Sequence, residues 1–121
     1  EIVVNLLPNT PETEDILGAK NFALVPTGAS VINLGRGPQI VDADLIAALD
    51  SGQLVAATLD VFREEPLPKE HPFWQHPRVT VIPHASRGQF PADITPIICN
   101  HLRRLQRGET MTDVVDLKAG Y

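Results

Sequence analysis

The 121-residue chain has a single cysteine, no long apolar run and no surplus of basic residues. Because Cys99 has no partner within the chain for a disulfide, the sequence favours a reducing cytoplasm. No apolar segment approaches the roughly 20 residues that cross a membrane, so we expect no membrane partner. Ten basic and 15 acidic residues give a net charge of -5 at pH 7, which argues against a nucleic-acid partner.

The first residue is not methionine, and an apolar segment typical of a buried strand follows it directly. A buried parallel strand seldom opens a complete domain without a lead-in. We therefore expect this chain to be the later part of a longer protein.

Short apolar segments alternate along the chain with segments typical of helices. Strands are expected at 2–7, 29–34, 54–61 and 79–82, and helices at 11–17, 19–24, 43–51 and 91–107. Asp42 is the expected cap of the helix from 43, and Pro96 predicts a kink or a later start of the last helix. The proline-containing stretch 62–76 has no periodicity and predicts an ordered loop. This alternation predicts an α/β fold with a parallel sheet covered by helices.

Charged residues follow the ends of three expected strands. Arg36 lies in the turn Gly35-Arg36-Gly37 after the second strand, Glu65 follows the third, and His84 follows the fourth. The two glycines let the backbone turn sharply and approach another segment closely. Since parallel α/β sheets bind ligands at the carboxyl ends of their strands, we expect the three charged side chains to gather at one edge.

An arginine, a glutamate and a histidine at one edge suit the reduction of a 2-keto acid. A carboxylate beside a histidine favours the imidazolium form, so His84 paired with Glu65 can give a proton to a developing oxyanion. Arg36 can bind a substrate carboxylate through two charge-assisted hydrogen bonds. A hydride source is the part that this group lacks.

Simpler interpretations stay open at this point. Arg36 can be a surface arginine in a glycine-rich loop, and the acids at 64–65 can form a solvated charge cluster. A zinc site could use three histidines, His71, His76 and His84. Their spacing fits no standard ligand pattern, and no cysteine pair accompanies them. Trp74 is more typical of an anchor that packs the loop than of a substrate platform.

The segments LPNTPET at 7–13, NLGRGPQIVD at 33–42, LDVFREEPL at 59–67 and PH at 83–84 follow one another in a specific order and spacing. Together they resemble the D-isomer-specific 2-hydroxyacid dehydrogenase family over nearly the whole chain. The segments at 72–79 and 114–121 look most like the glyoxylate/hydroxypyruvate reductase branch. The resemblance implies an NAD(P)-dependent oxidoreductase that reduces 2-keto acids of the glyoxylate or hydroxypyruvate type.

The resemblance also implies roles for individual residues in catalysis. Arg36 would bind the carboxylate and carbonyl of the substrate. His84 would be the acid/base, and Glu65 would hold and polarise it.

Five further residues are implied in cofactor binding, namely Pro8, Leu34, Gly35, Asp60 and Ser86. Asp60 would face the nicotinamide carboxamide, and Leu34 and Gly35 would line the cofactor through their backbone. Pro8 would lie near the adenosine, and Ser86 near the nicotinamide edge. The segment 84–87 departs from the commoner family pattern, which bears on the assignment of Ser86.

No G-x-G-x-x-G motif occurs in the chain, nor the residue that selects NAD or NADP. We therefore expect residues 1–90 to be the second half of a Rossmann-like doubly wound parallel sheet. Residues 91–121 would form a C-terminal helix and tail that return toward an absent substrate domain. Such a chain would expose an apolar edge strand and bind NAD(P)H, with NADPH favoured, weakly or not at all. The parent protein would be a homodimer.

Other functions fit the same resemblance. Some relatives are transcriptional corepressors, which use this fold as a non-catalytic binding module. A dehydrogenase for another 2-hydroxy acid, such as phosphoglycerate or D-lactate, is a further alternative.

Overall fold

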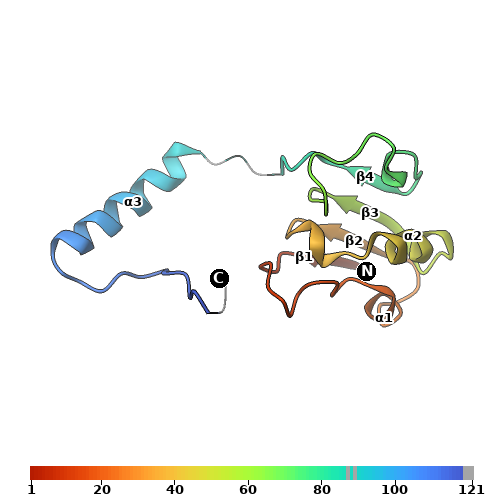
Figure 1. Ribbon diagram of the computed structural model, residues 1–121, viewed down its shortest axis with the longest axis horizontal. Helices are drawn as coiled ribbons and strands as arrows, with labels where there is room; N and C mark the ends of the chain where they lie inside the picture. Colours follow the sequence, from red (N-terminus) through yellow and green to blue (C-terminus); the bar gives the residue numbers. More distant parts are fainter. Residues whose placement is uncertain (87, 89, 119–121) are drawn as a thin grey trace. The chain divides into compact units, whose positions relative to one another are not determined.

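The computed structural model describes residues 1–86, 88 and 90–118, which fall into two compact units. The first unit is Glu1–Ser86 and contains the sheet. The second begins at residue 87 and contains the last helix. Figure 1 labels the elements of each unit.

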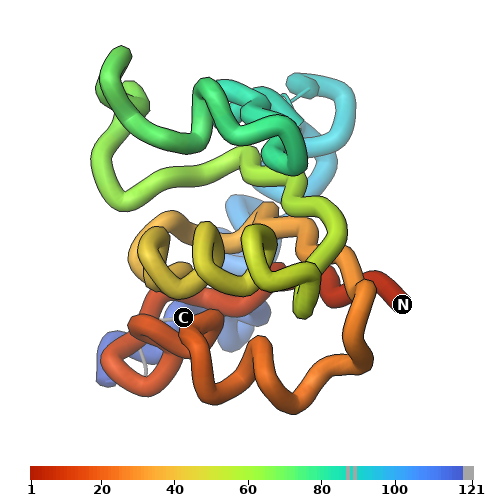
Figure 2. The backbone as a smooth tube through the Cα atoms, turned by 90° about the vertical axis from the view of Figure 1, so that its right-hand side faces the viewer, coloured from red at the N-terminus to blue at the C-terminus, as the bar shows by residue number. Residues whose placement is uncertain are grey.

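Four parallel strands form one sheet in the first unit, in the order β1-β2-β3-β4. They are β1 (Ile2–Asn5), β2 (Ala29–Asn33), β3 (Leu54–Leu59) and β4 (Val79–Val81). Figure 2 shows the chain advancing across the sheet from β1 in red to β4 in blue-green. The predicted α/β fold with a parallel sheet is therefore confirmed, although each strand ends slightly earlier than expected.

Helices cover one face of the sheet in this unit. Leu45 and Leu49 of α2 (Asp42–Asp50) are fully buried in a core that also contains Val31 of β2 and Leu59 of β3. On the other face, apolar side chains of β1 are exposed. The strands follow one another in a single direction, and right-handed crossovers then place their helices on the same side. The predicted cover of helices is thus present on one face of the sheet, while Ile2 and Val4 of β1 are exposed on the other face.

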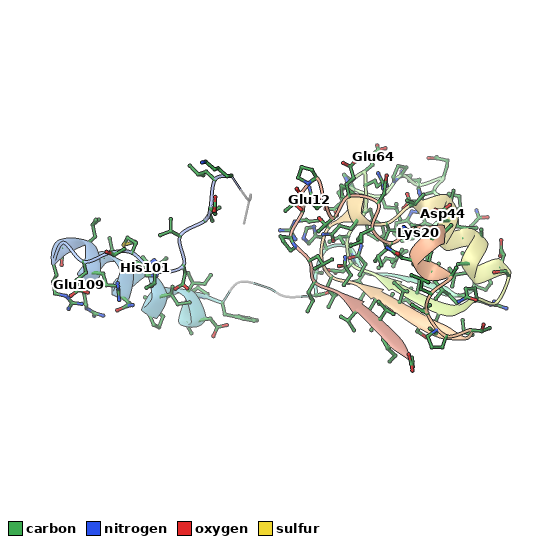
Figure 3. The ribbon with its side chains drawn as sticks, turned by 90° about the horizontal axis from the view of Figure 1, so that it is seen from below. Glu12, Lys20, Asp44, Glu64, His101 and Glu109 are labelled. Atoms are coloured by element: carbon green, nitrogen blue, oxygen red, sulfur yellow. The ribbon has the colours of Figure 1, made fainter. Side chains whose placement is uncertain are left out.

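The helical layer is tied together by side chains as well as by apolar contacts. The Asp44 carboxylate of α2 accepts a hydrogen bond of 2.8 Å from the Ala19 amide at the start of α1 (Ala19–Phe22). Figure 3 labels Asp44 and, on α1, Lys20. The Gln53 side chain donates to the carbonyls of Phe22, the last residue of α1, and of Val25 at 2.9 and 2.8 Å. These bonds fix the amino end of β3 against the segment that precedes β2.

The predicted helix at 11–17 is wrong, because residues 11–15 form turns. The Thr13 hydroxyl donates to the Pro8 carbonyl at 2.7 Å, and Asp15 has a positive φ of 55°. The amides of Asp15 and Leu17 donate to the carbonyls of Pro38 and Gln39. Hydrogen bonds to a distant segment have therefore replaced those of a helix.

The prediction that Asp42 caps α2 is wrong, because Asp42 is the first residue of this helix. The cap position is held by Val41, which makes no side-chain capping bond, and the Asp42 carboxylate lies 3.4 Å from His71 Nε2. The loop at 62–76 is ordered as predicted and contains a short 3-10 helix, η2 (Pro72–Trp74). A second one, η1 (Gly37–Gln39), begins at the last residue of the Gly35-Arg36-Gly37 turn.

The second unit consists of α3 (Pro91–Gln106) and the segment after it. The helix begins at Pro91 and runs through Pro96 without interruption, so a later start is excluded. The helix ends at Gln106, and Gly108, with a φ of 67°, follows its cap Arg107. The Gly108 amide donates to the Leu105 carbonyl, and the Glu109 amide donates to that of Arg104. None of the helices in the described part of the chain is long and apolar enough to cross a membrane.

Two neighbouring positions on β3 test the packing. Leu54 is fully buried and Val55 is 47% exposed. We expect Leu54→Ala to lower the free energy of unfolding by about 3 kcal/mol, because it leaves a cavity in the core. The control Val55→Ala should change it by less than about 0.5 kcal/mol. Urea titrations followed by circular dichroism measure both, and equal effects would contradict the assigned faces of the sheet.

Candidate active site

The carboxyl ends of the four parallel strands lie along one edge of the sheet. Arg36 follows β2, Asp60 follows β3 directly, and His84 follows β4. This arrangement is the one expected from the sequence, and it results from parallel pairing alone. Each side chain at the edge comes from a different loop.

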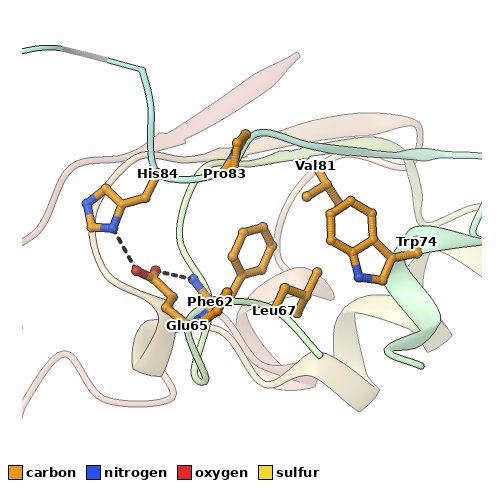
Figure 4. A pocket seen from close by; sticks show the side chains of 8 residues that line it. Phe62, Glu65, Leu67, Trp74, Val81, Pro83 and His84 are labelled. Atoms are coloured by element: carbon orange, nitrogen blue, oxygen red, sulfur yellow. Dashed lines mark hydrogen bonds and ion pairs between the residues drawn. The ribbon is translucent and has the colours of Figure 1, made fainter. Parts of the chain in front are cut away.

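His84 and Glu65 form a hydrogen-bonded pair. His84 Nδ1 lies 2.7 Å from Glu65 Oε2, and Glu65 Oε1 accepts a hydrogen bond of 2.9 Å from the Phe62 amide (Figure 4). Both carboxylate oxygens are therefore engaged, which fixes the orientation of Glu65. Since Nδ1 faces the carboxylate, Nε2 is the imidazole nitrogen left to meet a ligand.

Several influences act on the Glu65 carboxyl. Partial burial raises the pKa of Glu65, but the hydrogen bonds from His84 and the Phe62 amide act against it, as do the positive charges of His84 and Arg36. The net result is a pKa below the ordinary value, so Glu65 is a carboxylate near neutral pH. Arg36 contributes its charge to this group, although Glu65 pairs directly with His84.

The backbone around His84 is held in an unusual conformation. His84 has a φ of 49°, which is uncommon for a residue other than glycine, and its amide lies 2.9 Å from the carbonyls of Asp60 and Ile82. The buried Asp60 carboxylate accepts hydrogen bonds from the amides of Ala85 and Ser86 at 2.8 and 3.0 Å. Asp60 therefore binds the segment that follows β4 and sets the direction in which His84 leaves the sheet.

The turn that carries Arg36 is fitted between two segments. A Cβ atom on Gly35 would lie 2.4 Å from Gln39 Oε1, and one on Gly37 would lie 1.9 Å from the carbonyl of Phe62. The close approach expected of the two glycines is thus confirmed, and neither has the positive φ that a left-handed turn requires. The exposed Arg36 side chain donates from Nη1 to the Gly35 carbonyl at 2.8 Å.

Three buried amide side chains lie beneath this turn. Asn5 Nδ2 donates to Asn33 Oδ1 at 2.8 Å and to Gln39 Oε1 at 2.6 Å. Asn33 Oδ1 also accepts from the Gly35 amide at 3.1 Å. Sequence reasoning missed all three residues. The available signal was an amide at the last position of an apolar strand, at Asn5 and Asn33.

A cavity of about 440 Å³ adjoins the His84–Glu65 pair. Its lining is mostly apolar and consists of Phe62, Glu65, Pro66, Leu67, Trp74, Val81, Pro83 and His84 (Figure 4). Trp74 is half exposed, and its indole donates to the Pro68 carbonyl at 2.9 Å within the same loop. The tryptophan therefore anchors the loop, as expected, and also forms one wall of the cavity.

The remaining predicted cofactor residues lie at the same edge. The Pro8 carbonyl accepts from Gln39 Nε2 at 2.8 Å, and the Leu34 amide donates to the Asn5 carbonyl at 3.0 Å. A shallow cavity of about 310 Å³ lies beside Pro8 and is lined by Asn9, Thr10, Pro11, Glu14 and Pro38. Ser86 is exposed and is joined to Asp60 through its amide.

The three histidines considered for a zinc site do not come together. Each pairs with a different carboxylate, His71 with Asp42, His76 with Asp50 and His84 with Glu65. Within residues 1–86, 88 and 90–118, no group of three or more histidine, cysteine or acidic side chains is placed to hold a metal ion.

The sequence of residues 1–86 matches the model of a protein family, described as D-isomer specific 2-hydroxyacid dehydrogenase, NAD binding domain. The chain belongs to this family. It is 50% identical over its whole length to a glyoxylate/hydroxypyruvate reductase A from Serratia proteamaculans, of which it covers 39%. The relative from Photorhabdus laumondii is 46% identical and is likewise covered over 39% of its length. The chain thus spans about two fifths of the curated relatives it matches.

Solved structures agree with this family and with its use of a nicotinamide cofactor. A D-isomer specific 2-hydroxyacid dehydrogenase from Xanthobacter autotrophicus, in complex with NADPH and MES, is 45% identical with a TM-score of 0.92. The match covers 99% of this chain and 50% of that one. An NADPH-dependent glyoxylate/hydroxypyruvate reductase from Sinorhizobium meliloti, in complex with NADP and sulfate, is 38% identical with a TM-score of 0.92. That match covers 99% of this chain and 40% of the Sinorhizobium chain.

Gly37 tests the close approach of the arginine turn to the segment after β3. Gly37→Ala would place a Cβ on the Phe62 carbonyl, so we expect the free energy of unfolding to fall by about 3 kcal/mol. In the control Gly52→Ala, the new Cβ meets open space at a φ of 80°, and only about 1 kcal/mol of backbone strain is expected. Urea titration compares the two. Equal losses would show that the turn has room to move.

Glu65 gives a pH-dependent prediction. Because its pKa is lower when the chain is folded than its ordinary value of 4.5, ionised Glu65 stabilises the fold above that pH. The contribution is lost as the pH falls through the folded-state pKa. The difference in unfolding free energy between the unmodified chain and Glu65→Gln should therefore be positive at pH 7 and shrink on acidification.

Urea titrations between neutral pH and the acid limit measure this difference. The matched control is Glu64→Gln, which removes the exposed carboxylate next in sequence and should show no comparable pH-dependent difference. A Glu65→Gln difference that stays constant with pH would contradict the assigned pairing with His84.

Proposed function

We propose that the protein carrying this chain reduces 2-keto acids of the glyoxylate or hydroxypyruvate type to 2-hydroxy acids with NAD(P)H. The observation that supports this most directly is the 2.7 Å distance between His84 Nδ1 and Glu65 Oε2. This pair lies at the carboxyl edge of the sheet, which also carries Arg36. A histidine held by a carboxylate is a suitable proton donor. The names of the relatives support the substrate class.

Each catalytic residue has a definite task in this proposal. Arg36 binds the carboxylate of the keto acid, since a guanidinium can form two parallel hydrogen bonds to it. His84 donates the Nε2 proton to the carbonyl oxygen as that oxygen gains charge. Glu65 acts through His84: it holds the ring by Nδ1 and stabilises its protonated form.

The reduced nicotinamide, when bound, supplies the hydride that goes to the keto carbon. We place its binding residues at the same edge, with Pro8, Leu34, Gly35, Asp60 and Ser86 as the candidates. The buried Asp60 fits this role because the Ala85 and Ser86 amides fix one of its carboxylate oxygens. Its carboxylate is thus pre-oriented to accept a hydrogen bond from a carboxamide.

Further parts of the proposal concern the whole protein. NADPH is the favoured cofactor, because NADPH or NADP is bound in the two solved structures described above. We propose that residues 1–90 form half of the cofactor domain and 91–121 the return toward the substrate domain. This chain by itself would bind the cofactor weakly, since the glycine-rich motif is absent. A homodimer in the cytoplasm completes the proposal.

Replacement of His84 tests the proposed chemistry in the full-length protein. His84→Gln should lower kcat for glyoxylate by about a hundredfold or more, because the proton donor is lost. The NADPH dissociation constant should change by less than about twofold. Steady-state assays at 340 nm and a fluorescence titration measure these quantities.

The control for this experiment is His76→Gln. His76 pairs with Asp50 and does not line the cavity beside Glu65, so kcat should stay near that of the unmodified protein. A His84→Gln protein that retains full turnover would refute the assignment of the proton donor.

A further inference from the structure

Gln39 is fully buried, and its amide group uses both ends. Oε1 accepts from the Arg36 amide at 2.8 Å and from Asn5 Nδ2 at 2.6 Å. Nε2 donates to the carbonyls of Leu7 and Pro8 at 2.9 and 2.8 Å. One side chain thus joins the backbone of the arginine turn to the backbone that follows β1.

The arginine turn has little freedom to move independently of Gln39. The backbone at Gly35 approaches Gln39 so closely that an added Cβ would lie 2.4 Å from Oε1. On the other side, Gly37 is in contact with the backbone of Phe62. A displacement of the Gln39 amide would therefore be transmitted to the turn.

The Arg36 guanidinium depends on this backbone for its position. The side chain is exposed, and within the described residues its hydrogen bond from Nη1 returns to the adjacent Gly35 carbonyl. Because the Arg36 side chain is anchored on its own turn, its position depends on the position of that turn. Gln39 Oε1 is the group that receives the Arg36 amide.

An apolar side chain would be the simpler choice for filling this buried position. Burying an amide is unfavourable unless all of its hydrogen bonds are made, and Gln39 makes four through two atoms. Such a fully bonded group specifies one arrangement of the segments that it joins. Here those segments carry Arg36 and Pro8, which the proposed function places at the substrate and at the cofactor.

We propose that Gln39 is a positioning residue that fixes the Arg36 guanidinium relative to the Leu7–Pro8 segment. It thereby sets where the substrate carboxylate lies relative to the cofactor. This inference rests on the proposed function and assigns Gln39 no contact with the reacting atoms.

The chain offers a matched control in Gln53. Gln53 Nε2 also donates to two backbone carbonyls, at 2.9 and 2.8 Å, but it lies just before β3, at the amino edge of the sheet. Loss of its bonds should lower stability without affecting the arginine turn. Gln53→Met therefore separates a general loss of stability from a loss of positioning.

The experiment uses the full-length protein with glyoxylate and NADPH. Gln39→Met removes all four hydrogen bonds, and we expect KM for glyoxylate to rise about tenfold, with a smaller change in kcat. Gln53→Met should leave KM within about twofold of the unmodified protein. Thermal melts report the stability of both variants.

Gln39→Asn keeps a neutral amide at this buried position but shortens the side chain by one methylene. The shorter amide cannot bond to the Arg36 amide and to the Leu7 and Pro8 carbonyls at once. We expect KM for glyoxylate to rise above that of Gln53→Met. This variant decides the matter if Gln39→Met does not fold, and an unchanged KM for glyoxylate would then overturn the inference.

The outcomes distinguish this inference from the proposed function. An unmodified protein that does not reduce glyoxylate refutes the proposed function itself. An active protein in which Gln39→Met leaves KM unchanged, or raises it no more than Gln53→Met does, refutes the positioning role alone.

Discussion

The site depends on one steric constraint, the contact of Gly37 with the backbone of Phe62. The two backbones lie so close that no side chain fits between them. The arginine turn after β2 and the segment after β3 are therefore packed directly against each other. The Phe62 amide donates to Glu65, which in turn binds His84. The backbone contact thus joins the loops that carry Arg36 and Glu65, and the Glu65 side chain extends the connection to His84.

A network of buried amide side chains also supports the arginine turn. Asn5, Asn33 and Gln39 place amide groups at the carboxyl edge, where the ends of parallel strands leave backbone groups without sheet partners. Their side chains meet those groups, including the amides of Gly35 and Arg36. The Asp60 carboxylate does the same for the segment after β4. Polar residues are buried here because the strand ends would otherwise contain unsatisfied donors and acceptors.

The sequence alone predicted the parallel sheet and the pairing of Glu65 with His84. Both follow from general rules: apolar strands alternating with helices pair in parallel, and parallel strands end at one edge. The helix expected at 11–17 did not form, because Asp15 and Leu17 bond to Pro38 and Gln39, partners that local propensity cannot reveal. Gln39 was missed for the same reason, since its importance lies in contacts more than 30 positions away in sequence.

The way Glu65 is held has a consequence for how the loop can evolve. Its two partners are the Phe62 amide, three positions earlier, and His84, in the segment after β4. Neither lies in the stretch from Leu67 to His71, which precedes the buried Phe73. Insertions or deletions in that stretch would reshape the cavity wall near Trp74 while leaving the His84–Glu65 pair in place. The shape of this cavity and the geometry of the His84–Glu65 pair are therefore separable along the chain.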